Sequence, residues 1–336
     1  MSIPDPSPYQ SPRTLESSSR PVVPSPSSPQ PPTVLWWGVA CGTAAAVLYT
    51  ISNIALRQSV SIDPFLVSAV KAGPTVLFLG PVIAWMLIRG QPITTNRRMI
   101  PKFMLVALMG QFVGNAAFQI ALGVIGLAAA VPITLGVLLI GGAMLGRIVL
   151  GEPVRIATIV SMVTLIIAAI VLSLPSSTPK VQQASSELPI WVGGLSAAAS
   201  GAAYALFGVV MRKTMNDGVS APLTMFLSGA VGTVALWSFT LIQHGIEPIT
   251  TLQSHQWAVM GAGGLFNFLA FVALSYALKA LPVVAVNLIN ASQVAMAAMA
   301  GVVLFAEPVT WQLMSGIGLT FAGLLILMRG RLSPLS

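Results

Sequence analysis

The sequence predicts an all-α polytopic membrane protein whose ten transmembrane helices form two inverted five-helix repeats. Of its 336 residues 55% are hydrophobic and 7% are charged, which leaves too few polar side chains to cover a water-soluble globule. From Val34 onward the chain contains ten apolar runs. Each is about 20 residues long, enough to cross a hydrocarbon core of about 30 Å. The second half of the chain also repeats features of the first half in the same order.

The repeat is visible in matched residues. Three residues of the first half recur about 155 positions later: Trp36, Tyr49 and Arg57 recur as Trp191, Tyr204 and Arg212. Further along, Glu152-Pro153-Val154 recurs as Glu307-Pro308-Val309. A duplicated hydrophobic half is typical of secondary transporters, whose central site forms where two repeats meet.

Five helices are expected in each repeat. The first repeat, residues 34–174, should hold helices over 34–56, 64–88, 101–122, 126–148 and 154–174. The second repeat, residues 189–329, should hold helices over 189–211, 220–242, 256–278, 282–304 and 309–328. Residues 175–188 are polar and read as a linker between the repeats. Because five is odd, the sixth helix begins on the opposite side of the membrane from the first, so the repeats are inverted.

Residues 1–33 are rich in Pro and Ser and contain no apolar run, so we expect a disordered tail. They also lack the basic start and apolar stretch of a signal peptide, and the first membrane helix should act as the insertion signal.

The basic residues predict the orientation. With a cytoplasmic N-terminus, twelve Lys or Arg residues near the spans lie inside, against Arg57 and Lys180 outside. We therefore expect an integral protein of the cell (inner or plasma) membrane with both termini in the cytoplasm. The net charge of +8 is spread over short gaps and never forms a basic patch with aromatics, so nucleic acid is not an expected partner. The expected partners are the lipid bilayer and a small-molecule substrate, and a homodimer stays open.

The duplicated pattern resembles a known family. Besides Glu-Pro-Val, the segment Ala121-Leu122 recurs as Ala277-Leu278 before the fourth helix of each repeat. These features resemble the EamA-like family of the drug/metabolite transporter superfamily. The resemblance implies a transporter of small polar or amphipathic organic substrates, commonly exported. The four-helix multidrug exporters of that superfamily use an intramembrane carboxylate, whereas this chain has no Asp or Glu in the middle of a predicted span.

Three charged residues near or within the spans, Glu152, Glu307 and Lys71, can each have a structural or a functional role. Glu152 and Glu307 lie in hairpins, where capping a helix or pairing with Arg147 or Arg155 is favoured over a transport role. Lys71 lies seven residues into the second helix. It either attracts an anionic group of the substrate or extends its long side chain to the interface.

Uncharged amides in the spans follow helix faces. Gln111, Asn115 and Gln119 recur four apart on the third helix, and Asn267 matches this stripe on the eighth. On the ninth helix Asn287, Asn290 and Gln293 recur three apart. In lipid an unpaired amide is costly, so these side chains should face a polar cavity or hydrogen-bond neighbouring helices.

These patterns predict a secondary transporter, and the family resemblance implies export. The predicted substrate-binding residues are Tyr49, Lys71, Asn115, Gln119, Tyr204, Asn267, Asn290 and Gln293. An uncharged, amide-rich site suits amino acids and related metabolites. No cofactor, metal site or catalytic group is predicted. A phosphate-sugar or nucleotide-sugar exchanger is the alternative, although such sites generally need several buried Lys or Arg residues. A membrane-embedded enzyme or receptor-like protein is the alternative outside the carriers.

Overall fold

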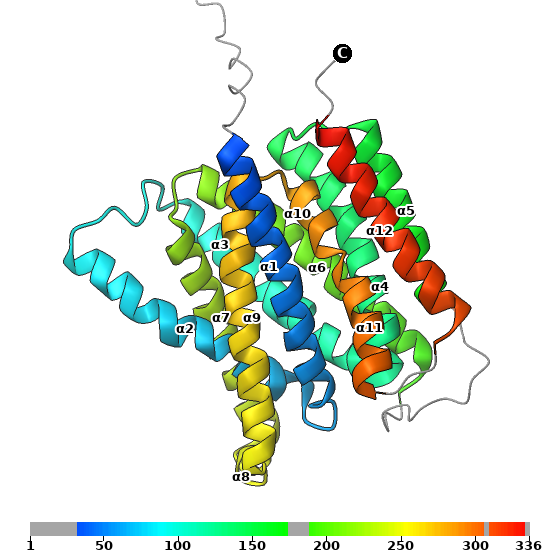
Figure 1. Cartoon of the computed structure of the whole chain (residues 1–336). Coiled ribbons are helices and arrows are strands. Elements are labelled where there is room, and N and C mark those ends of the chain that lie inside the picture. The colour runs from blue at the N-terminus through cyan, green and yellow to red at the C-terminus, as the bar shows by residue number, and fades with distance from the viewer. Residues whose placement is uncertain (1–31, 174–187, 306–308, 333–336) are drawn as a thin grey trace, which may run out of the picture.

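The computed structural model describes residues 32–173, 188–305 and 309–332, and within them the elements are helices joined by short turns (Figure 1). The predicted tail as far as residue 31, and the predicted linker as far as residue 187, lie outside the described residues, as does Glu307. The predicted all-helical class is confirmed.

The helices follow the predicted runs closely. The first half contains α1 (Pro32–Arg57), α2 (Pro64–Ile88), α3 (Met99–Met109), the π-helix η1 (Gly110–Ala116), α4 (Ala117–Leu150) and α5 (Ile156–Ser173). The second half contains α6 (Ile190–Asn216), α7 (Ala221–His244), α8 (Glu247–Thr250), α9 (Ser254–Ala280), α10 (Val283–Asn290), α11 (Gln293–Phe305) and α12 (Trp311–Leu332). Among the described residues, eight helical segments are long and apolar enough to cross a membrane. Two further apolar segments, Ile156–Ala168 and Met314–Gly323, are shorter. The chain is an integral membrane protein.

The ninth predicted span, 282–304, is present as the candidate span Val283–Ala300, but its helix is not continuous as expected. The helix stops at Asn290 and restarts at Gln293, with Ala291 and Ser292 in a turn between α10 and α11. The Ser292 hydroxyl donates to the carbonyl oxygen of Ile289 at 2.7 Å. Such side-chain bonds to the local backbone compete with helical hydrogen bonds, and this favours the break.

The third predicted helix also departs from a regular α-helix, because its middle winds as the π-helix η1. A π-turn closes hydrogen bonds one residue further along the chain than an α-turn does. Side chains after η1 are therefore rotated about the helix axis relative to an unbroken α-helix. The predicted gap before the fourth helix is reduced to a kink at Gly126, whose φ of 77° suits a residue without a Cβ.

Helices from the two halves pack against each other. Helix α1 runs along α9, α4 along α6, α2 along α7 and α5 along α12 (Figure 1). At the α4–α6 contact, a Cβ on Gly201 would lie 2.3 Å from the carbonyl oxygen of Thr134. Only glycine permits this approach, as expected where helices associate through small residues. The first turn of α1 and the last turn of α12 lie at the same end of the molecule (Figure 1).

Candidate functional site

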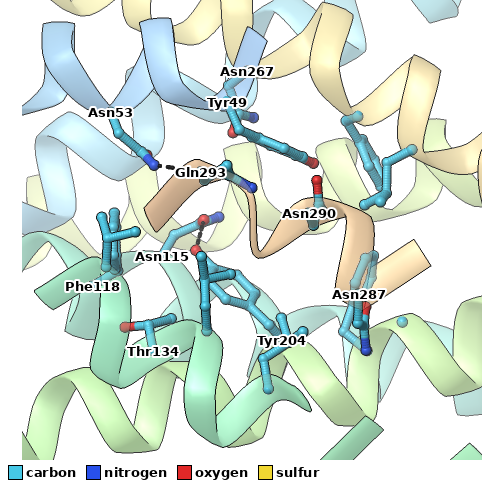
Figure 2. Close-up of a pocket in the computed structure, with 18 of the residues that line it drawn as sticks. Tyr49, Asn53, Asn115, Phe118, Thr134, Tyr204, Asn267, Asn287, Asn290 and Gln293 are labelled. Carbon is cyan, nitrogen blue, oxygen red and sulfur yellow. Dashed lines mark hydrogen bonds between the residues drawn. The ribbon is translucent and has the colours of Figure 1, made fainter. Parts of the chain in front are cut away.

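A cavity of about 150 Å³ lies between the helices of the two halves. Holding one water molecule takes about 10–15 Å³ measured in this way, so the cavity has room for roughly ten non-hydrogen atoms. Its apolar lining consists of Phe118, Val131, Leu135, Leu138, Phe207, Phe271, Leu274 and Leu278. Its polar lining contains most of the residues that the sequence singled out (Figure 2).

Seven of the eight predicted site residues line this cavity: Tyr49, Lys71, Asn115, Tyr204, Asn267, Asn290 and Gln293. They come from α1, α2, η1, α6, α9, α10 and α11. Residues far apart in the chain thus meet in one small volume, as in a ligand site with a few placed polar groups.

Gln119 does not line the cavity, so it is removed from the candidate site. Its side chain is 3% exposed, and its amide donates to the carbonyl oxygen of Leu56 at 3.2 Å. The even spacing of Gln111, Asn115 and Gln119 predicted a single stripe on an α-helix. Because η1 lies within that stretch, Gln119 turns away from the other two amides and joins α4 to α1 instead.

Asn115 is the centre of a hydrogen-bond network on η1. Its Oδ1 accepts from Lys71 Nζ at 3.0 Å. The same oxygen accepts from the Tyr204 hydroxyl at 2.6 Å (Figure 2). Its Nδ2 donates to Gln111 Oε1, and the Gln111 amide donates in turn to the carbonyl oxygen of Ser228 at 3.2 Å. The network joins η1 to α2, α6 and α7. Every side-chain amide in it has a protein partner.

The backbone of η1 allows this network to form. A Cβ on Gly114 would lie 2.6 Å from the Tyr204 ring, so glycine lets the ring pack directly on the helix. The Ser200 hydroxyl donates to the Gly114 carbonyl oxygen at 2.7 Å. This bond supplies a partner for a backbone group of the π-helix, an arrangement frequent at functional sites.

Lys71 points into the protein and does not extend to the interface. Lys71 is 6% exposed, and its Nζ donates to a neutral group, the amide oxygen of Asn115. Within the described part of the chain, Lys71 has no ion pair. The ammonium group carries three donors, so two remain to bind a ligand. Of the two readings of the sequence, the geometry favours contact with an anionic group.

The turn between α10 and α11 forms the facing side of the cavity. Asn290 is 6% exposed, and its Oδ1 is buried without a hydrogen-bond partner among the described residues. Gln293 Oε1 accepts from Asn53 Nδ2 at the long distance of 3.4 Å (Figure 2). A buried acceptor that no protein donor reaches is a candidate contact for a ligand.

The prediction left out several polar residues that line the cavity: Asn53, Gln111, Thr134, Ser228 and Asn287. Gln111 and Asn287 belonged to the recognised amide stripes, so the pattern held the signal for both. Ser228 carried no such signal, because a single serine in a membrane helix is common and its position depends on α7 packing against η1.

Glu152 does not line the cavity, and its contacts join α4, α6 and α10. Its Oε1 lies 3.0 Å from Arg212 Nε, and its Oε2 accepts from the backbone N–H of Val283 at 2.9 Å. Arg212 Nη1 also donates to the carbonyl oxygen of Leu278 at 2.7 Å. The predicted capping role is present, since Val283 begins α10. Arg212 on α6 is an ionic partner that the spacing along the chain did not predict.

Helices of membrane-spanning length around a mostly apolar cavity with convergent amides define a membrane protein built to hold a small solute. Residues 191–329 match the EamA-like transporter family, and this part of the chain is an EamA-like transporter domain of the drug/metabolite transporter superfamily.

One solved crystal structure covers 88% of this chain over 99% of its own length, with a TM-score of 0.67 and 19% sequence identity. At that identity the likeness concerns the fold. No curated protein matches the chain.

Proposed function

We propose that the chain is a secondary transporter of small organic metabolites, amino acids and related solutes first among them, which bind in the cavity. The family supports the transporter class, and its members are generally not enzymes. The observation that carries the proposal is the composition of the lining. Uncharged amides surround the cavity together with one buried ammonium group, Lys71. Amides offer donors and acceptors without a net charge, which suits neutral or zwitterionic solutes.

The size and charge of the cavity favour small solutes over sugar phosphates. Among the described residues that line the cavity, Lys71 is the one basic residue. A diphosphate or a sugar phosphate would require several positive groups. A volume that fits roughly ten non-hydrogen atoms also suits an amino acid better than a nucleotide-sugar.

Two matched contacts support an inverted repeat as the framework for alternating access. Arg57 Nη1 donates to the carbonyl oxygen of Leu122 at 3.2 Å, and Arg212 Nη1 donates to that of Leu278 at 2.7 Å. Both partners of each pair are related by the repeat of about 155 residues. The same relation carries α1 onto α6 and α9 onto α3 and η1, and accordingly α1 packs against α9 while α6 packs against α3 and η1. Transport then consists of rocking the two repeats around a central site.

The proposed orientation has both termini in the cytoplasm, on the charge asymmetry of the sequence. Export is proposed from the resemblance to the EamA-like family alone. A tag inserted at Lys180 should be labelled from outside intact cells. Labelling only after the cytoplasmic side is opened would contradict the ten-span scheme.

The cavity itself is tested by filling it. Gly208 on α6 lines the cavity, and a Cβ added there meets no atom within 4 Å. Gly208→Leu should therefore fold normally and occupy the space that a ligand needs. In a thermal-shift and uptake screen of purified protein against amino acids, nucleosides and related metabolites, a solute that stabilises the protein should lose that effect in Gly208→Leu. A stabilising solute that is unaffected by this change binds elsewhere.

Lys71→Gln gives the second arm of this test. It should weaken ligands that carry a carboxylate by about tenfold or more, with a smaller effect on uncharged ligands. Equal effects on both kinds of ligand would exclude Lys71 as the anion contact.

A further inference from the structure

The break between α10 and α11 exposes a chemical asymmetry in the cavity. The amides of the η1 network are hydrogen-bonded to other protein groups. At the break, the side-chain oxygen of Asn290, Oδ1, has no hydrogen-bond partner among the described residues. Because Asn290 is only 6% exposed, bulk water does not supply a hydrogen bond to this oxygen. A buried acceptor left unpaired is costly, and its presence here calls for a donor from a bound molecule.

The position of Asn290 strengthens the demand for a donor. Asn290 is the last residue of α10, and its side chain lines the cavity just before the turn of Ala291 and Ser292 (Figure 2). The C-terminal end of a helix carries a partial negative charge from its last carbonyl groups. A positively charged donor is therefore favoured beside this oxygen over a neutral one.

The rest of the cavity restricts which positive group can bind. The described lining contains no Asp or Glu, and Lys71 from α2 lines the same cavity. A ligand with net positive charge would meet Lys71 without a counter-ion, which is unfavourable in a buried site. A positive group fits here only when the same ligand also carries a negative group for Lys71.

We propose that the α10–α11 turn is an ammonium subsite, in which Asn290 Oδ1 accepts a hydrogen bond from the α-ammonium group of a zwitterionic ligand. The carboxylate of that ligand contacts Lys71, and its side chain lies along the apolar lining that includes Phe207 and Phe271. This inference rests on the proposed transport function and deepens it. It makes Asn290 the residue that distinguishes an amino acid from the corresponding simple carboxylic acid.

The test uses two sets of ligands, and the members of each set share a side chain and differ only in their charged groups. The first contains L-leucine, its deaminated acid 4-methylpentanoate and its decarboxylated amine isopentylamine. The second contains L-phenylalanine, 3-phenylpropionate and 2-phenylethylamine. Binding to the full chain in detergent is measured by thermal shift and by calorimetry. The unaltered protein should bind the amino acids about tenfold or more tighter than either partial analogue.

Substitutions at position 290 then assign the subsite. Asn290→Leu should weaken the amino acids by about tenfold or more and change the deaminated acids by less than about twofold. Asn290→Asp keeps an acceptor oxygen at nearly the same place and should retain amino-acid binding. Gln119→Leu is the matched control, because Gln119 is a buried amide in the same part of the membrane that does not line the cavity. It should leave every ligand constant unchanged.

Several outcomes would overturn the inference, and they separate it from the proposed function. If Asn290→Leu weakened the binding of amino acids and of deaminated acids equally, Asn290 would not be a contact for the ammonium group. Failure of both amino acids to bind, while other solutes stabilise the protein in a manner that Gly208→Leu abolishes, would overturn the subsite and leave the carrier function standing. If no solute responds to Gly208→Leu, the proposed function fails as well. A loss of folding in Asn290→Leu is recognised from its melting curve, and Asn290→Asp then decides alone.

Discussion

The η1 side of the cavity and the α10–α11 side both present amides, and they differ in how those amides are partnered. On the η1 side, Asn115 and Gln111 bond to Lys71, Tyr204 and Ser228, so the network joins α2, α6 and α7. On the other side, Asn290 Oδ1 has no partner within the described residues.

The difference follows from the local backbone. The π-helix keeps the chain helical and turns two amides toward neighbouring helices, where they find partners. The break after Asn290 ends a helix and leaves its amide at the edge of an open volume. Amides of the same kind are therefore partnered differently on the two sides of one cavity. The η1 amides are hydrogen-bonded within the protein, whereas Asn290 Oδ1 has no partner among the described residues and is the oxygen that we propose a ligand contacts.

The largest stability effect is expected at Asn115. Asn115→Leu removes the acceptor for both the Lys71 ammonium and the Tyr204 hydroxyl, leaving a buried charge without its partner. The free energy of unfolding should fall by about 3 kcal/mol or more. Denaturation of the purified protein in detergent measures this loss. Asn115→Asp retains the acceptor and should recover most of it, and an undiminished stability in Asn115→Leu would remove the distinction between the two sides.

A smaller loss is expected at Glu152, which lies outside the cavity. Glu152→Gln keeps the shape of the side chain and weakens the charged hydrogen bonds to Arg212 and to the N-terminus of α10. The expected cost is about 1.5–3 kcal/mol, measured by the same denaturation. Ligand constants should change little, because Glu152 does not line the cavity. A strong effect on binding with unchanged stability would instead connect Glu152 to the transport cycle.

Gln119→Leu should cost about 1 kcal/mol, because it removes one hydrogen bond between neutral groups, from the Gln119 amide to the Leu56 carbonyl oxygen. This variant measures what a buried amide contributes to stability when no charged group depends on it. A loss as large as that of Asn115→Leu would mean that the charge of Lys71 adds nothing to the η1 network.

The smallest stability effect is expected at Asn290, where Asn290→Leu removes an oxygen that has no protein partner. The ligand-free protein should keep its stability within about 1 kcal/mol, or gain slightly, since an unpaired buried acceptor is lost. Melting curves with and without ligand make the measurement. A large loss in the ligand-free protein would show that Asn290 stabilises the fold, contrary to the comparison.

The helical class and the approximate ends of the helices could be predicted from the sequence, and seven of the eight residues predicted for the site line the cavity. Membrane spans are readable because their length is set by the bilayer and their composition by local contact with lipid. Polar residues at helical spacing are readable for the same reason, since few other places in a membrane protein accept them.

How those residues are partnered could not be predicted from the sequence. The π-helix that turns Gln119 away, the break after Asn290 and the pairing of Glu152 with Arg212 all depend on groups from distant parts of the chain. A periodic pattern assumes an unbroken helix, and one added residue per turn or a short break changes which face a side chain occupies. Which amide keeps a free acceptor depends on every donor that packs near it. That outcome is fixed by the arrangement of the helices in space.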